Sequence, residues 1–142
     1  MGMWLIYALL SAATAALVAI FGKIGLKDVD ANSATAIRAV VMAVFLLGVV
    51  AAQGKFGQLG ELFAQRKAML FILLSGAAGA LSWLFYFLAL KSGKVSQVGP
   101  IDKLSVVLAV VLAYFFLGER ISYLNAAGVA LIAVGVFLTA IK

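Results

Sequence analysis

The fold is decided by the uncharged stretch Ala68–Leu90, which reads AMLFILLSGAAGALSWLFYFLAL. A helix needs roughly 20 predominantly apolar residues to cross the hydrocarbon core of a bilayer, and this run is long enough. The strict alternation of apolar and polar residues that is typical of membrane barrels is absent from it. Since backbone groups inside hydrocarbon must pair within the protein, we predict a transmembrane helix here.

Further apolar runs flank this stretch on both sides, and short polar breaks separate them. We predict the spans at about residues 2–22, 31–52, 68–90, 95–117 and 121–141. Asn32 or Ser33 is available as the N-cap of the second span. In the longer connection after that span, Gln58–Gln65 could form a short interfacial turn. The first span lacks a preceding Lys or Arg, so we expect it to be retained rather than cleaved.

The composition requires a lipid environment. Of the 142 residues, 66% are hydrophobic and 11% are charged, and the mean hydropathy is +1.21. Soluble domains have about 25% charged residues, and a small one buries only about 60–70% of the surface that its unfolded chain exposes. The lipid bilayer is therefore the first expected partner. We predict an all-α membrane protein in which residues 1–142 form a single domain of five transmembrane helices.

The charge and the missing residue types exclude several functions. The net charge is +6, but the basic residues stand singly between apolar runs, where they suit lipid headgroups. We expect no nucleic acid as a partner. The chain has no cysteine and no histidine, and it lacks the GxxxxGK[ST], GxGxxG and GxSxG motifs. We therefore expect no metal, no cofactor and no enzymatic activity, and any transport would be driven by a gradient or an exchange.

The loop charges give almost no preferred orientation. With five spans, the connections after the second and fourth spans lie on one face and hold Lys55, Arg66, Lys67 and Arg120. The other face holds Lys23, Lys27, Lys91, Lys94 and Lys142. Orientation normally follows a bias in Lys and Arg between the faces. One hypothesis is that copies insert both ways and pair antiparallel. The alternative is a fixed orientation that Arg38 and Lys103, inside the spans, determine.

Three charged residues inside predicted spans are the first candidates for a substrate or ion pathway: Arg38, Asp102 and Lys103. A charge at membrane depth normally faces the bundle interior or a water-filled cavity and has a partner. Because neighbouring residues are about 100° apart on a helix, we expect Asp102 and Lys103 not to pair with each other. Arg38 would then be the available partner for Asp102. Such a pair could be a proton relay, an electrostatic latch or a fixed salt bridge.

Pro100, Trp83 and Tyr86 complete the candidate pathway. If Pro100 lies inside the fourth span, it removes a hydrogen bond and bends the helix beside Asp102. If the helix begins near Gly99, Pro100 is simply its first residue. Trp83 and Tyr86 lie three residues apart and either pack the bundle or line a pocket for an organic or cationic substrate. Small residues in the same span, including Gly76 and Gly79, favour close helix packing.

An aromatic-Ala-Leu helix end, a proline-bearing span and the tripeptide LGE follow one another in Phe85–Leu138, FYFLALKSGKVSQVGPIDKLSVVLAVVLAYFFLGERISYLNAAGVALIAVGVFL. In this stretch the chain resembles the EamA family of the drug/metabolite transporter superfamily. Arg38 and the first span extend the resemblance over essentially the whole chain. It implies a half-sized exporter or exchanger of metabolites, because ten-helix members of the family contain two such repeats in inverted orientation. The Ile-Asp-Lys-Leu-Ser that follows Pro100 departs from the family's apolar pattern.

These observations lead to one main functional hypothesis and two alternatives. The main one is a secondary transporter of a small metabolite in the cell (inner) membrane. It would work by alternating access as an antiparallel homodimer, or as a dimer with a related half-sized chain. The first alternative is a flippase, or a flippase subunit, for a lipid-linked headgroup. The second is a non-transporting membrane subunit.

Overall fold

The structure is a computed structural model that describes residues 2–140. Five segments are helical, long and apolar enough to cross a membrane: Met3–Gly25, Ala31–Ala52, Arg66–Ser92, Val95–Leu117 and Tyr123–Ala140. No strand occurs within residues 2–140. The prediction of an all-α membrane protein with five spans is confirmed. Ile141, at the predicted end of the fifth span, and Lys142 lie outside the described residues.

The helices form two compact units. One takes the described residues of Met1–Lys23 and Ser92–Lys142, and the other is Ile24–Lys91. That the chain works as a single domain remains a prediction.

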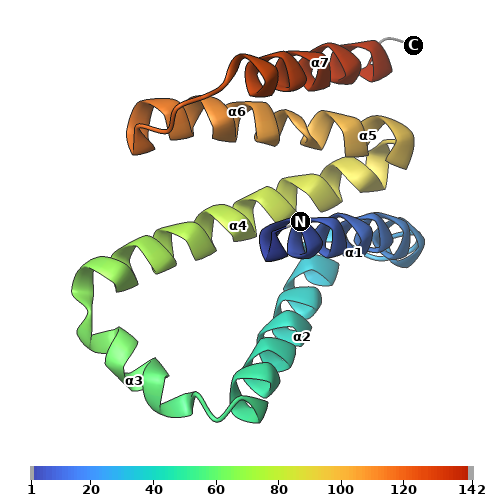
Figure 1. The fold of residues 1–142 in the computed structure, drawn as a ribbon. Coiled ribbons are helices and arrows are strands. Elements are labelled where there is room, and N and C mark those ends of the chain that lie inside the picture. Colours follow the sequence, from blue (N-terminus) through green and yellow to red (C-terminus); the bar gives the residue numbers. More distant parts are fainter. Residues whose placement is uncertain (1, 141–142) are drawn as a thin grey trace. The chain divides into compact units, whose positions relative to one another are not determined.

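The unit Ile24–Lys91 contains α2 (Ala31–Ala52), the short α3 (Phe56–Ala64) and most of α4 (Arg66–Ser92) (Figure 1). The N-cap of α2 is Asp30 rather than the expected Asn32 or Ser33, and its carboxylate accepts a 2.8 Å hydrogen bond from the Ser33 backbone N–H. An aspartate oxygen is a strong acceptor for an unpaired N–H in a first helical turn. This contact therefore fixes the residue at which α2 begins.

The connections of this unit have clear local causes. After α2, Gly54 adopts a φ of +66°, the left-handed conformation that commonly ends helices. The predicted turn at Gln58–Gln65 is the two-turn helix α3, which presents an exposed Phe63. At the other end of α4, the Lys91 ammonium donates a 2.6 Å hydrogen bond to the Val29 carbonyl. This contact ties the end of α4 to the connection that precedes α2.

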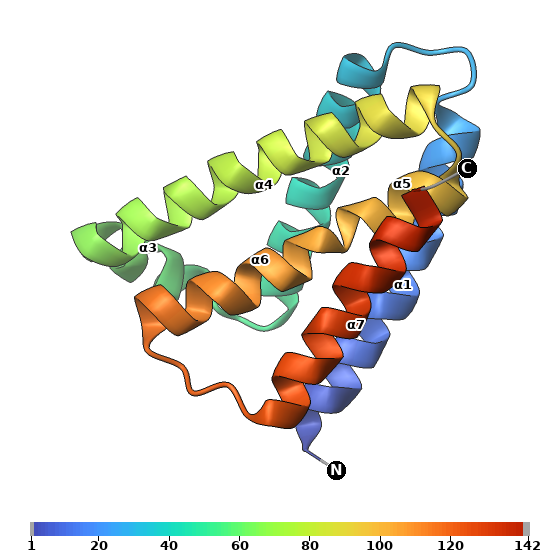
Figure 2. The same ribbon diagram turned by 90° about the horizontal axis from the view of Figure 1, so that it is seen from above.

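In the other unit, the fourth span is interrupted. It consists of α5 (Val95–Asp102), α6 (Leu104–Leu112) and a π-helical turn, η1 (Ala113–Leu117). Figures 1 and 2 show α7 (Tyr123–Ala140) running beside both α5 and α6, with which it packs. Gly118, with a φ of +66°, ends the π turn. In the same unit the Lys23 ammonium of α1 (Met3–Gly25) donates a 2.8 Å hydrogen bond to the Gly93 carbonyl.

The interruption has a visible cause in the sequence. Pro100 lies inside α5, not at its first position, and lacks the N–H that the Ser96 carbonyl would accept. Three residues later the helix opens at Lys103, whose ψ is −7° and whose N–H donates to the Pro100 carbonyl at 2.9 Å. The Ser105 hydroxyl donates to the Asp102 carbonyl at 2.6 Å. This side chain therefore satisfies a backbone acceptor that the break would otherwise expose.

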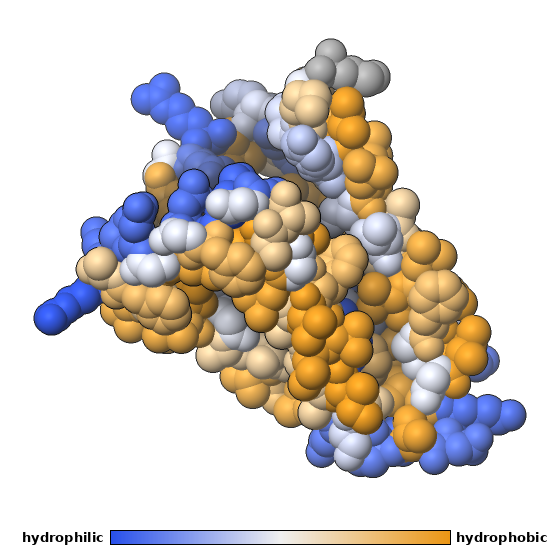
Figure 3. Space-filling view, turned by 90° about the horizontal axis from the view of Figure 1, so that it is seen from below, coloured by the Kyte–Doolittle hydropathy of each residue, from blue (hydrophilic) through white to orange (hydrophobic). Residues whose placement is uncertain are grey.

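Apolar side chains cover much of the face seen in Figure 3, and hydrophilic ones gather at its margins. Large apolar residues are strongly exposed, among them Phe116 at 81% and Leu131 at 72%. Within the described residues the buried apolar side chains are Ala19, Leu26, Ala31, Phe87, Leu90 and Val136. Exposing this apolar surface to water would cost free energy. Hydrocarbon removes that cost because lipid tails are as apolar as the side chains.

Candidate functional site

The polar face of α2 carries the first part of the site. Asn32, Thr35 and Arg38 follow one another at intervals of three residues, which places them on the same side of the helix. Met42 continues that side one turn further on. Because Arg38 is the eighth residue of α2, its backbone lies roughly 10 Å from the start of the helix. The guanidinium therefore extends from a position within the span.

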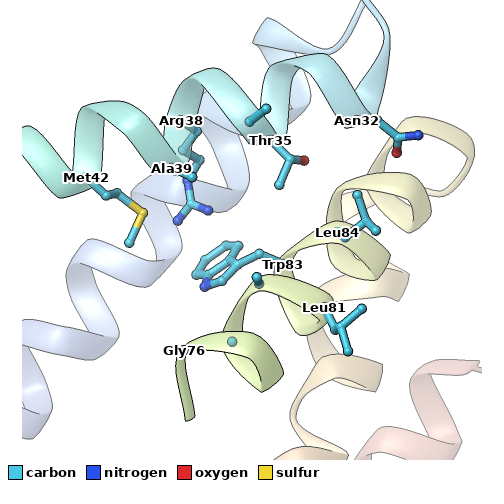
Figure 4. A pocket seen from close by; sticks show the side chains of 12 residues that line it. Asn32, Thr35, Arg38, Ala39, Met42, Gly76, Leu81, Trp83 and Leu84 are labelled. Carbon is cyan, nitrogen blue, oxygen red and sulfur yellow. The ribbon is translucent and has the colours of Figure 1, made fainter. Parts of the chain in front are cut away.

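The partner of this cation is an aromatic ring. The guanidinium carbon of Arg38 lies 3.6 Å from the centre of the Trp83 ring and 5.2 Å from that of Phe87, both on α4. Figure 4 shows the Arg38 side chain reaching from α2 to the indole. Attraction between a cation and the negative face of an aromatic ring is strongest for tryptophan and increases as water is removed. The contact with Trp83 can therefore stabilise the Arg38 charge inside a span.

Neighbouring aromatic rings hold the indole in place. Phe87 is buried and meets Trp83 edge-on, with the ring centres 6.0 Å apart. Tyr86 meets the other two rings at 5.6 Å from Trp83 and 6.2 Å from Phe87, also edge-on. Edge-to-face pairs at these separations are favourable. The cluster makes Trp83 a preorganised platform for the guanidinium.

A cleft opens beside the Arg38–Trp83 pair, between α2 and α4. Its volume is about 520 Å³, and its lining is predominantly apolar. The space beside Gly76 and Gly79 is open, because a Cβ added at either position would meet no atom within 4 Å. Asn32, Thr35, Ala36, Arg38, Ala39, Met42, Gly76, Gly79, Ala80, Leu81, Trp83 and Leu84 line the cleft (Figure 4). The Arg38 guanidinium therefore borders an apolar cleft whose volume suits a small molecule.

A second charged group lies at the break in the fourth span. The Lys103 ammonium forms a 3.1 Å salt bridge with the Asp102 carboxylate. The expectation that these neighbours cannot pair is wrong, because it assumed a continuous helix through both. The helix opens at Lys103, and the long lysine side chain reaches back to the carboxylate. The two side chains are 56% and 33% exposed, respectively.

The predicted pathway residues thus fall into two groups. Arg38, Trp83 and Tyr86 lie together in the unit Ile24–Lys91, although the lining of the cleft includes Trp83 and not Tyr86. Pro100, Asp102 and Lys103 lie together at the break in the other unit. A pairing of Asp102 with Arg38 stays a prediction.

The sequence reasoning missed Asn32, Thr35 and Met42 as lining residues, and it assigned Gly76 and Gly79 only to helix packing. A signal for Asn32 and Thr35 was present, because they precede Arg38 at intervals of three residues. No comparable signal links α2 to Trp83, because the pairing depends on how the two helices meet.

The fold and this cleft define a multi-pass helical membrane protein with a charged group held inside its spans. Comparison with known proteins gives the class. Residues 2–141 match the EamA-like transporter family, and the chain belongs to that family. It is 44% identical over 138 residues to a Sinorhizobium protein named "Uncharacterized transporter in cobO 3'region". The match covers 97% of this chain and 96% of that one, so the relative is also half-sized. No solved structure matches the chain significantly.

The predicted family is therefore confirmed, and the chain is a multi-pass membrane transporter.

Proposed function

We propose that the chain is a secondary transporter that moves a small metabolite across the cell (inner) membrane by alternating access, as an antiparallel dimer. The observation that carries the proposal is the near-even division of Lys and Arg between the two faces of the five spans. A chain without an orientation bias inserts both ways, and two opposed copies would reproduce the pair of inverted repeats that ten-helix transporters carry on one chain.

The location of the C-terminus tests this arrangement directly. Fusions after Lys142 to a cytoplasm-active reporter and to a periplasm-active reporter are compared in parallel cultures. Comparable activity of both supports insertion in both orientations and an antiparallel homodimer. Activity of only one reporter overturns the homodimer, and an oppositely oriented, related half-sized chain becomes the partner to seek.

The two charged groups supply candidate pathway residues. A helix broken by proline inside a span leaves backbone groups available to a substrate and provides a place where the span can bend. In this proposal the break at Asp102–Lys103 moves during the transport cycle, and the α2–α4 cleft holds the substrate.

Substitution at the break tests that role. Pro100→Ala restores the missing N–H, and we expect it to slow exchange in proteoliposomes while raising thermal stability. Unchanged exchange by Pro100→Ala, Asp102→Asn and Lys103→Met would remove the break from the mechanism.

A flippase for a lipid-linked headgroup is the second candidate. The feature that favours it is the apolar lining of the cleft around one cation, which also suits an amphiphile. Exchange of soluble substrates by the pure protein argues for the transporter. Movement of a labelled anionic lipid between leaflets, with no exchange of soluble substrates, argues for the flippase.

A further inference from the structure

The Arg38 charge lacks an acidic partner within its own unit. Across residues 24–91, all of which the structure describes, its recorded contacts are those with the Trp83 and Phe87 rings, and no carboxylate forms an ion pair with it. The Trp83 ring contacts the guanidinium at its central carbon, 3.6 Å from the ring centre, and Arg38 donates no hydrogen bond to another residue of the unit. The five N–H donors lie in the plane of that group and remain suited to an oxyanion.

The side chains around Arg38 determine what kind of anion the cleft could accommodate. Asn32 adds a second polar side chain on the same side of α2, whereas the Thr35 hydroxyl already donates to the Ala31 carbonyl at 2.7 Å. Beyond these groups the lining is apolar, with Met42 on α2 and Leu84 on α4. A fully polar anion would lose hydration in this space without replacing it. An anion with an apolar body has little hydration to lose over that body, and its charged end is bound by Arg38.

From this geometry we infer that the α2–α4 cleft binds an organic oxyanion. Its carboxylate or phosphate receives bidentate hydrogen bonds from the edge of the Arg38 guanidinium, and its apolar body lies in the space left by Gly76 and Gly79. Charge complementarity is the argument for this occupant. A guanidinium inside a span that no carboxylate of its own unit neutralises retains a desolvation cost, and an anion lowers that cost. The inference rests on the proposed function, since it names the substrate class for the transporter's cleft.

Trp83 provides a direct reporter of binding. The chain has two tryptophans, and Trp4 is exposed on α1. The tryptophan emission of the Trp4→Phe protein, in phosphatidylcholine nanodiscs, therefore comes from the cleft alone. The probes are hexyl phosphate and hexanoate, with hexylammonium and hexanol as controls of matched apolar length. An anion on the guanidinium changes the field at the stacked indole, so we expect a saturable emission change with the two anions only.

Variants separate Arg38 from general surface charge. In the Trp4→Phe background, Arg38→Met should raise the dissociation constant for hexyl phosphate at least about tenfold. Arg38→Lys should give an intermediate loss, because lysine keeps the charge but not the bidentate fork. Arg66→Met is the matched control, because it removes an exposed cation of the same unit outside the cleft and should leave binding unchanged. Circular dichroism and size-exclusion profiles check that each variant is folded.

Several results would overturn the inference. Equal responses to hexylammonium or hexanol would show that the cleft takes any amphiphile, and an equal loss in Arg66→Met would assign the effect to surface charge. If no probe changes the Trp83 emission and acrylamide does not quench it, the protein itself fills the cleft. If Arg38→Met does not fold, Arg38→Lys and the comparison of probes on the Trp4→Phe protein still decide the question.

The source of the anion is decided by a lipid arm of the same experiment. Nanodiscs in which phosphatidic acid replaces part of the phosphatidylcholine should change the Trp83 emission only if a lipid headgroup reaches the cleft. A response to hexyl phosphate in pure phosphatidylcholine points to a soluble substrate. Because none of these measurements requires transport, binding without exchange counts against the proposed function alone, whereas exchange that Arg38→Met does not alter counts against this inference alone.

Discussion

The contact between Arg38 and Trp83 should stabilise the pairing of α2 with α4 by a measurable amount. We expect the substitutions Arg38→Met and Trp83→Leu to be non-additive, with a coupling free energy of about 1–2 kcal/mol. The range follows from the 3.6 Å separation and the half-buried state of both side chains, since cation–π contacts contribute about 0.5–1 kcal/mol when exposed and about 2 kcal/mol when desolvated. Phe87, at 5.2 Å, should couple with Arg38 more weakly.

The assay is a double-mutant cycle on the free energy of unfolding. Each variant is titrated from mild detergent into dodecyl sulfate, and the loss of helical circular dichroism gives the transition. Phe85→Leu serves as the matched control, because Phe85 is on the same helix, is 63% exposed and makes no recorded contact with Arg38. A coupling between Arg38 and Trp83 below about 0.3–0.5 kcal/mol, the scatter expected for independent sites, would refute this account of how the charge is held.

Three further perturbations test other parts of the molecule. Gly118→Ala should destabilise the end of the fourth span by about 1–2 kcal/mol in thermal unfolding, because its φ of +66° crowds any Cβ. The pKa of Asp30 lies below its ordinary value because the Ser33 backbone N–H donates to the carboxylate. The contribution of the Asp30 cap to stability is therefore complete above the ordinary aspartate pKa and is lost as pH falls through the lowered pKa of Asp30. The hydrogen-exchange protection of the Ser33 amide should accordingly fall in acid. The Asp30→Asn substitution should abolish this pH dependence. Lys103→Met should lower exchange in proteoliposomes about tenfold by leaving Asp102 unpaired, whereas Lys103→Arg should retain activity.

The spans could be predicted because the polar breaks between them are unambiguous. Lys27 and Asp30 bound the second span on one side, and Gly54 and Lys55 bound it on the other. The structure places that helix at Ala31–Ala52, as expected from these residues. A run of apolar residues in lipid has no alternative to helix, so local sequence determines this level of structure.

The interior of the fourth span could be predicted only in part. Pro100 indicated a bend, but the opening at Lys103 depends on whether local groups compensate for lost hydrogen bonds. Here the Ser105 hydroxyl provides one of the compensating bonds. The contact between Asp102 and Lys103 follows from that opening. Regular helix geometry, which places neighbouring residues about 100° apart, therefore gave the wrong expectation for this pair.

The cleft could be predicted least of all. Arg38 and Trp83 were both identified from sequence, yet for different reasons and with different partners. Their contact depends on the rotation of α2 and α4 about their own axes. The spacing of Asn32, Thr35 and Arg38 indicates one face of α2, but α4 is apolar on most sides, so no periodicity identifies the surface that meets it. The buried Phe87 fixes one of these surfaces only once the helices have packed.

The broken fourth span also has a consequence for biosynthesis. Each charged residue near the centre of a span opposes release from the translocon into lipid by about 2.5–3.5 kcal/mol, and Pro100 adds an unpaired carbonyl. The helix α7 packs along both α5 and α6 but is synthesised after them. We expect this packing to offset part of the cost. The nascent fourth span should therefore wait beside the translocon until α7 emerges, and the two should enter the membrane as a hairpin. A chain stopped after Gly118 would then retain its first three spans in the bilayer and lose the fourth.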